Sequence, residues 1–363
     1  MKKKLFILFI YFFLYINSSS TNKSYIFNSK KNLLNIQTNY TANNKKNVIV
    51  GVIENYYLNM ILPFFKSFIK SNFHNCDVVI FVRYVPQIIT DYLSSIGVIV
   101  HEIPNNYKNI RIINLRWKIY TNFLSQNMNK YKLILHCDIR DTFFQKDIFK
   151  YYENQKSFLG VSLEDGTLNE HLNKKWIIDL AGDKIHKAIQ NERIINIGSL
   201  LGTVDKFLEF SIYFWDKLLQ NPNCIEQGIA NYIFYYEKMF KNCLLKSDNY
   251  GPIMTLGLTR KEKIIIDSDD NILNFKGEVA AVIHQYDRKP ELVKKVKNKY
   301  CPEIGFYEKL ISNNYEYHKK KRLDEIKYIS KKNKNIIHLL ISLYFFGIIL
   351  VIKRKSRKLI KYD

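Results

Sequence analysis

The sequence lacks the cysteine spacings that bind zinc, because none of its five cysteines forms a Cys-x-x-Cys pair. It contains no zinc-finger or RNA-recognition motif. It is also short of negative charge, with 33 acidic against 56 basic residues and a formal net charge of +23. Lysine, asparagine, isoleucine and tyrosine are abundant along the whole length, which indicates a compositional bias. An anionic substrate or a membrane surface explains the charge as well as nucleic acid does, and we predict no nucleic-acid partner.

Internal repeats are absent as well, and the composition does not match that of a disordered chain, since 47% of the residues are hydrophobic and 15% aromatic. The 363 residues suffice for one large or two small domains with a real core. Cys224 and Cys243 form a disulfide in one interpretation, which requires an oxidising compartment and leaves an odd thiol; spacing alone does not settle it.

Two apolar segments frame the chain. Three lysines precede the apolar run 5–16, which a polar stretch follows, and this order is typical of a signal peptide or an uncleaved signal anchor over residues 1–20. Near the other end, residues 336–352 contain no Asp, Glu, Lys or Arg, and about 17 residues is the short limit for a membrane span. The basic tail 353–363 follows at once, which predicts a cytosolic C-terminus. The alternative is a buried or amphipathic terminal helix, although the segment has no polar face.

This topology places the intervening chain in the secretory lumen. We expect a stem over residues 21–46, a catalytic domain over 47–302 and a juxtamembrane linker or helix over 303–335. Glycosylation sequons begin at Asn17, Asn22 and Asn39. The C-terminus carries no KDEL-type signal, so a membrane of the Golgi or the endoplasmic reticulum fits equally, with the plasma membrane as an alternative.

Strand and helix patterns alternate through the first half of the domain. Buried strands are predicted over 47–53, 76–82, 98–103 and 131–137, with helices over 57–73, 88–96 (ended by Gly97) and 116–128. This order predicts an α/β fold with a doubly wound, mainly parallel sheet. Further on, strands are predicted over 157–163, 194–202, 263–267 and 278–284, and helices over 205–219 and 226–240; residues 291–334 suggest a Lys-rich helix or linker.

Two carboxylates follow the fourth predicted strand. Asp138 and Asp141 flank Arg140 at the end of an apolar run, where open α/β sheets bind ligands. Clustered carboxylates repel each other unless a cation offsets them, and a divalent metal carrying a diphosphate would do so. The alternative is a solvated turn in which Asp141 caps the next element.

Four stretches in order resemble the GT-A-type nucleotide-diphospho-sugar glycosyltransferases, with an Asp-x-Arg-Asp version of the Asp-x-Asp motif found in eukaryotic and protist members. They are Asp138-Ile-Arg-Asp-Thr-Phe-Phe-Gln, Asn196-Ile-Gly-Ser-Leu-Leu-Gly-Thr, Glu226-Gln-Gly-Ile-Ala-Asn-Tyr and Val282-Ile-His-Gln-Tyr-Asp-Arg. The resemblance covers residues 48–302. It implies a Rossmann-like GT-A fold and an enzyme of the hexosyltransferase class, which the two terminal segments would anchor in the membrane with its domain in the lumen. Such an enzyme moves a sugar from a nucleoside diphosphate donor to a glycan, protein or lipid acceptor.

The resemblance also implies a metal site for Mn²⁺ or Mg²⁺, with Asp138, Asp141 and His284 as ligands. The second aspartate comes one residue later than in the common motif, so which carboxylate touches the metal stays open. The alternative for His284 is a core histidine that bonds a backbone carbonyl. Asp287 and Arg288 are interpreted as a supporting salt bridge.

Six residues are candidates for binding the nucleotide sugar: Gly51, Glu54, Arg116, Arg140, Gly198 and Gly202. In such a fold Gly51 and Glu54 lie near the base and ribose, and Arg116 contacts phosphate unless it is only solvated. Arg140 pairs with Asp141 or reaches a phosphate as a planar fork. Gly198 and Gly202 let the backbone approach the ligand, or simply make a tight turn.

Three residues are candidates for catalysis. The resemblance implies that Glu226 faces the acceptor, as a general base or as a group that stabilises charge on the sugar, although a first-turn carboxylate also caps a helix. Asp165 competes with Glu164 for the same role, and Asn196 can hold sugar hydroxyls. Two other functions remain open: a metal-dependent lumenal hydrolase, which would need a second metal site, and a non-catalytic membrane glycoprotein with this fold.

Overall fold

The computed structural model describes residues 45–302. The predicted signal segment, nearly all of the stem, the three sequons, the linker over 303–335, the apolar segment over 336–352 and the basic tail lie outside the described residues. Within residues 45–302, no helix is both long and apolar enough to cross a membrane.

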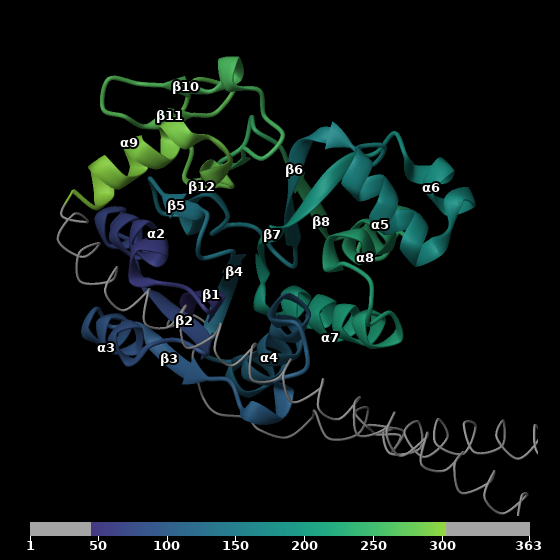
Figure 1. The fold of residues 1–363 in the computed structure, drawn as a ribbon, viewed down its shortest axis with the longest axis horizontal. Helices are drawn as coiled ribbons and strands as arrows, with labels where there is room; N and C mark the ends of the chain where they lie inside the picture. Colours follow the sequence, from purple (N-terminus) through teal and green to yellow (C-terminus); the bar gives the residue numbers. More distant parts are fainter. Residues whose placement is uncertain (1–44, 303–363) are drawn as a thin grey trace, which may run out of the picture. The chain divides into compact units, whose positions relative to one another are not determined.

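A seven-stranded sheet forms the centre, in the order β3-β2-β1-β4-β7-β6-β8 (Figure 1). Its strands are β1 (Lys46–Glu54), β2 (Cys76–Arg83), β3 (Ile99–Glu102), β4 (Tyr131–Cys137), β6 (Leu159–Thr167), β7 (Arg193–Thr203) and β8 (Leu244–Ser247). All neighbours pair in parallel except at β7, which runs antiparallel to β4 and to β6. The predicted mixed α/β architecture with a mainly parallel sheet is confirmed.

Alternate residues of the inner strands enter two separate cores, one on each face of the sheet. In β1, Ile49 and Ile53 belong to one core, whereas Val48 and Val50 belong to the other. Helices α2 (Leu58–Lys70) and α3 (Gln87–Ser95) contribute to the first core. Helices α4 (Ile112–Asn127) and α7 (Val204–Gln220), which lie side by side in Figure 1, contribute to the second. The sheet is therefore covered by helices on both faces.

The strand order reverses between β1 and β4. From β1 the chain builds outward to β2 and β3, and α4 then returns it across the other face to β4, on the opposite side of β1. In open α/β sheets such a reversal leaves a crevice at the carboxyl ends of the two strands. The crevice here is expected where β1 ends at Glu54 and β4 ends at Cys137.

A small three-stranded sheet brings a distant segment to this edge. Its order is β5 (Thr142–Phe144), β12 (Val282–His284) and β9 (Ile253–Thr255). His284 pairs with Thr142 on one side and with Thr255 on the other. Because Thr142 follows Asp141 directly, this register brings His284 to the end of β4. A two-stranded hairpin, β10 (Ile265–Ile266) and β11 (Ile272–Leu273), replaces the longer strand predicted over 263–267.

The second half differs from the sequence prediction in several elements. Helices α5 (His171–Ala181) and α6 (Asp183–Ile189) were not predicted, and neither were β5, β8 and β9. The helix predicted over 226–240 ends early: α8 (Glu226–Asn231) passes into a π-helical turn, Tyr232–Tyr236. Short 3₁₀ turns cover Asn105–Tyr107, Ile148–Tyr151, Lys261–Lys263 and Tyr286–Arg288.

The last described helix belongs to the folded domain. Helix α9 (Pro290–Tyr300) buries Leu292, Val296 and Tyr300, and it packs against α2. The Lys-rich segment that the sequence assigned to a helix or linker over 291–334 therefore begins as a helix, inside the predicted domain bounds of 47–302. All five cysteines lie in the described range and are free thiols, so the Cys224–Cys243 disulfide is not formed.

Candidate metal centre

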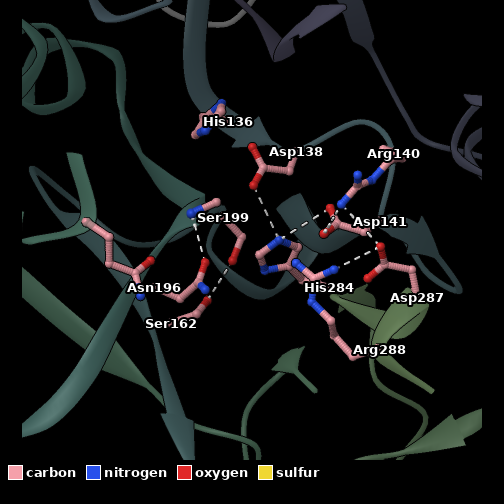
Figure 2. Close-up of polar contacts among 12 residues, drawn as sticks. His136, Asp138, Arg140, Asp141, Ser162, Asn196, Ser199, His284, Asp287 and Arg288 are labelled. Carbon is pink, nitrogen blue, oxygen red and sulfur yellow. Dashed lines mark hydrogen bonds and ion pairs between the residues drawn. The ribbon is translucent and has the colours of Figure 1, made fainter. Parts of the chain in front are cut away.

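Three predicted ligands meet at the carboxyl end of β4. Asp138 follows β4, Asp141 precedes β5, and His284 ends β12. One ligand atom from each lies within 4.8 Å of the other two. The Nε2 of His284 is 3.6 Å from Asp138 Oδ2 and 3.6 Å from Asp141 Oδ1 (Figure 2). These separations exceed a hydrogen bond, yet a single cation can contact all three groups after small side-chain shifts.

The imidazole of His284 supports a ligand role. The residue has no exposed surface, and neither ring nitrogen has a hydrogen-bond partner. The alternative of a core histidine bonded to a backbone carbonyl is therefore wrong. Buried polar atoms without partners cost free energy, and a cation at Nε2 would supply a partner for that nitrogen. Two carboxylate oxygens and an imidazole nitrogen suit a divalent ion such as Mn²⁺, and harder Mg²⁺ less well.

Gly198, in β7, forms the wall of this cluster. The backbone N–H of Asp138 donates to the carbonyl of Gly198 at 2.8 Å. A Cβ built on Gly198 would overlap Asp138 Oδ2 and would lie 2.6 Å from Cε1 and 2.8 Å from Nε2 of His284. Only glycine leaves the space between the three ligands open at this position.

The charges of the cluster are set by burial and by a nearby arginine. Burial favours the neutral form of Asp138, but the guanidinium of Arg116 and the imidazole of His284 outweigh it and hold the Asp138 pKa well below its usual range. Burial, reinforced by the charge of Asp138, raises the pKa of Asp141 to about 6. Burial opposes the charged form of His284, but the two aspartates raise its pKa overall. The Asp138 carboxylate therefore stays ionised and can attract a cation.

Arg116 and Glu226 form a buried ion pair beside the cluster. Arg116 is 2% exposed, and its Nη1 donates to Asp138 Oδ1 at 2.5 Å. Its Nη2 and Nε bond the two carboxylate oxygens of Glu226, the latter at 3.2 Å. Both oxygens of Glu226 are thus occupied, and the indole N–H of Trp117 adds a further bond at 2.7 Å. Burial nevertheless raises the pKa of Glu226 to about 7.

This geometry changes the interpretation of both residues. The guanidinium of Arg116 is used by two carboxylates, which favours a role in positioning Asp138 over the predicted phosphate contact. Both oxygens of Glu226 already accept hydrogen bonds, so the geometry favours its ion pair with Arg116 over the predicted role as a general base.

Strand β6 separates the two competing carboxylates onto opposite faces. Glu164 is buried, and its Oε1 accepts from Asn196 Nδ2 at 2.6 Å and from Gln227 Nε2 at 3.3 Å. Its charge contributes to the raised pKa of His284. Asp165 instead accepts from Thr259 Oγ1 at 2.9 Å and pairs with Arg193 at 3.4 Å. Glu164 is therefore the carboxylate on the side of the metal cluster, and Asp165 is not.

Asn196 lies in the same network on β7. Its Oδ1 accepts from the backbone N–H of Gly198 at 2.8 Å, while its Nδ2 donates to Glu164. Figure 2 shows Asn196 on the same side of the site as Ser199. The amide thus fixes the glycine that faces the metal ligands. Its predicted contact with sugar hydroxyls would use its remaining N–H.

Two glycines expected to contact the nucleotide sugar are closely packed against other parts of the chain. A Cβ on Gly51 would overlap the side chain of Ile139, whose Cγ1 would lie 2.7 Å away. A Cβ on Gly202 would lie 2.8 Å from the carbonyl oxygen of Phe158. Gly202 pairs with Ile134 in the middle of β4, away from the strand end, so the predicted ligand contact has no support there.

Charged groups surround the carboxyl ends of β1 and β4. Glu54 lies at the end of β1, as predicted. Its carboxylate accepts a hydrogen bond from Arg83 Nε at 2.5 Å and is therefore already paired. Arg140 lies 3.2 Å from Asp287 and 3.9 Å from Asp141, so Asp287 is its nearer partner. Arg288 also bonds Asp287, at 3.2 Å, as the sequence suggested. Arg140 Nε is buried without a partner.

Two features near the cluster were missed from the sequence. Tyr56, in the loop after β1, lies close enough for Asp138 and Asp141 to act on it: burial first, then these charges, raise its pKa. Gln285 follows His284 with φ 57° and ψ 34°, a left-handed conformation that is uncommon outside glycine and often marks a site under constraint. A tyrosine after a buried strand was the only sequence signal for Tyr56.

Comparisons with known proteins give a distant likeness. No protein-family model and no curated protein sequence matches this chain. Among solved structures, it resembles an active-site mutant of LgtC, with 13% identity over 70% of this chain and 96% of that one, at a TM-score of 0.43. It also resembles the galactosyltransferase LgtC in complex with donor and acceptor sugar analogs, with the same identity and coverage and a TM-score of 0.41. Both values are low, so the chemistry must be inferred from this chain's own residues.

Proposed function

We propose that this chain is a glycosyltransferase of the hexosyltransferase class, which uses Mn²⁺ or Mg²⁺ and a nucleoside diphosphate sugar. One observation carries the proposal: Asp138, Asp141 and the unpartnered imidazole of His284 converge at the carboxyl end of β4, beside the reversal of strand order. That position is where open α/β sheets bind nucleotides. The donor set fits a divalent ion that carries phosphate oxygens.

The residues of the crevice have separable roles in this proposal. A bound metal would neutralise the diphosphate and make it a better leaving group. Asp138, held by Arg116, and Asp141 and His284 would be its protein ligands. Arg140, whose buried Nε lacks a partner, would donate to a phosphate oxygen. Its charge lies beside Asp287, which keeps the guanidinium in place.

The sugar end of the donor would lie over β6 and β7. Glu164, Asn196 and Gln227 form one hydrogen-bonded set there, and Glu164 carries a charge that acts on His284. Amide and carboxylate groups of this kind bind sugar hydroxyls. Glu164 replaces Asp165 and Glu226 as the carboxylate best placed to act on the transferred sugar.

The proposal includes a location. The basic and apolar pattern at both ends favours a secretory-pathway membrane, in the Golgi or endoplasmic reticulum, with the domain in the lumen and an anchor at residues 336–352. A glycan, protein or lipid of that compartment would be the acceptor.

The test is donor turnover by the purified full-length protein. Release of nucleoside diphosphate from UDP-glucose, UDP-galactose, UDP-N-acetylglucosamine and GDP-mannose would be measured with Mn²⁺, with Mg²⁺ and with EDTA. We expect metal-dependent release from one of these donors, and loss of at least about 100-fold in Asp141→Asn, since even supporting residues of metal sites cost 10–100-fold.

The matched control is Asp269→Asn, which changes the same side chain in an exposed loop. It should turn over the donor at the wild-type rate. Folded protein that releases no nucleoside diphosphate from any of the four donors would contradict the proposal, as would metal-independent release that Asp141→Asn leaves unchanged.

A further inference from the structure

A second cleft opens on the face of β6 that carries Asp165. It has a volume of about 510 Å³, and its lining includes Asp165, Arg193, Asp248, Tyr250, Lys263 and Phe275. These residues come from the end of β6, the start of β7, the β8–β9 loop and the segment that contains the β10–β11 hairpin. No role described above uses this cleft.

Hydrogen bonds to neighbouring residues fix the polar groups of this cleft. Arg193 donates to the backbone carbonyl of Glu164 at 2.9 Å and to Asp248 Oδ2 at 3.1 Å. Asp248 Oδ1 accepts from the backbone N–H of Tyr250 at 3.0 Å. Asp165 is fixed by Thr259 at 2.9 Å, so the planar guanidinium and both carboxylates keep fixed orientations. Such preorganised planar groups hydrogen-bond adjacent hydroxyls without losing much side-chain entropy.

Aromatic surface lies beside these polar groups. Tyr250 is 51% exposed and meets Phe275 edge to face, with ring centroids 5.3 Å apart at 86°. Lys263 extends over the Phe275 ring at 5.9 Å. A large exposed aromatic residue buttressed by a second ring provides an apolar platform with a fixed orientation.

The charges of the lining favour a neutral ligand. Two acidic and two basic side chains line the cleft, and Arg193 pairs with both acidic ones. An anion such as a nucleotide would meet as much repulsion as attraction. A ligand with many hydroxyls and one apolar face fits both the planar polar groups and the aromatic platform.

The cleft is tied to the candidate metal centre through two short connections. Asp165 follows Glu164, which bonds Asn196 on the other face of β6. Asn249, in the cleft, accepts from the backbone N–H of Thr255 at 2.9 Å, and Thr255 pairs with His284. The cleft is therefore linked to the metal centre through β6 and β9, although it lies outside that centre.

We infer that this cleft binds a neutral saccharide, which serves as the acceptor of the transferase. The acceptor role rests on the proposed function, whereas the saccharide site itself does not. Tyr250 would pack on the sugar ring, and Arg193, Asp165 and Asp248 would bind its hydroxyls.

The test is saccharide binding by the full-length protein in EDTA, without a donor. Saturation-transfer NMR would be recorded with methyl β-galactoside, methyl β-glucoside, methyl α-mannoside, N-acetylglucosamine and lactose. We expect saturation of the ring C–H groups of at least one probe, and about tenfold weaker binding in Tyr250→Ala because the aromatic platform is lost. Phe275→Leu should weaken binding less and serves as the second variant if Tyr250→Ala folds poorly.

Tyr151→Ala is the control, since Tyr151 is 46% exposed and lies outside the cleft. It should bind like the wild type. Absence of saturation for all five probes would overturn the inference, and so would unchanged binding in both cleft variants or displacement of the saccharide by UMP at equal concentration. Because neither metal nor donor is present, a failed donor assay with intact saccharide binding would overturn only the proposed function.

Discussion

Gly198 faces His284 across the carboxyl end of β4, so closely that a methyl group on the glycine would lie 2.8 Å from the imidazole Nε2. The same methyl group would overlap Asp138 Oδ2. Two segments almost 90 residues apart in sequence thus leave a space bounded by one backbone and three ligand side chains.

Gly198→Ala should therefore abolish metal binding while the fold survives. The added methyl group would overlap Asp138 Oδ2 and crowd the imidazole of His284, so the ligands would have to move apart. The loss should be at least about 100-fold in Mn²⁺ affinity. Isothermal titration with Mn²⁺ measures it. Gly277→Ala is the control: it lies in open space with φ 84°, so it should cost about 1 kcal/mol of stability but leave Mn²⁺ affinity intact. If Gly198→Ala binds Mn²⁺ with wild-type affinity, the metal does not bind at Asp138, Asp141 and His284.

Metal affinity should depend on pH through Asp141. Burial raises the pKa of this carboxyl to about 6, so below pH 6 a proton must leave before the oxygen can bind a cation. The raised pKa of His284 adds a second competing proton, whereas Asp138, whose pKa is lowered, stays ionised. We expect Mn²⁺ affinity to fall by at least about tenfold between pH 6 and pH 5, and to become independent of pH well above pH 7. Titrations at a series of pH values with constant ionic strength would show this, and a flat profile between pH 5 and pH 7 would argue against these ligands.

Removal of Arg116 should destabilise the protein strongly. Arg116→Met leaves Glu226 and Asp138 as close carboxylates without their counter-charge, and breaking a buried pair costs about 3–5 kcal/mol. Urea denaturation measures the loss. Lys175→Met, in an exposed pair with Asp179, should change the midpoint little. The double variant Arg116→Met with Glu226→Leu should recover part of the lost stability, because it removes the unpaired carboxylate of Glu226. If it recovers none, the loss in Arg116→Met is not caused by that unpaired carboxylate.

Glu164 and Asp165 should affect different steps, although they are neighbours in sequence. Glu164→Gln removes the charge that acts beside Asn196 and His284, and we expect kcat for donor turnover to fall by about tenfold. Asp165→Asn alters the saccharide cleft, so acceptor KM should rise while donor hydrolysis without acceptor stays unchanged. Steady-state kinetics with each substrate varied separates the two. Equal effects of both changes on kcat would contradict the assignment of Glu164 and Asp165 to two different sites on opposite faces of β6.

The sequence was informative where elements are long and local. Every helix and strand up to Cys137 was predicted within a few residues, because buried parallel strands and amphipathic helices carry strong periodicity. Strands β5, β8 and β9 have three or four residues each and depend on pairing with distant partners, which periodicity does not record. The helix predicted over 226–240 was too long because the pattern continues through the π-helical turn at Tyr232.

In the candidate site, too, the residues with a local sequence signal were predicted and those that depend on distant partners were not. The aspartates at the end of β4 were evident as a strand-end pair, and His284 joined them by resemblance alone. The pairing of Arg116 with Glu226, 110 residues away, has no local signal. Arg116 was therefore assigned to a phosphate contact and Glu226 to catalysis, and neither was assigned to the other. The packing of Ile139 against Gly51 and of Phe158 against Gly202 could not be foreseen, because a glycine required by a neighbouring group and one required by a ligand look identical in sequence.

The register that joins His284 to Thr142 has a consequence for the whole domain. An ion shared by Asp141 and His284 would clip the two ends of a loop of about 140 residues, and cross-links that close long loops restrict the unfolded chain most. Removal of the metal should therefore loosen the small sheet and α9 more than the central sheet. Trypsin should cut these two regions faster in EDTA than in Mn²⁺, at a stage when the central strands are still protected.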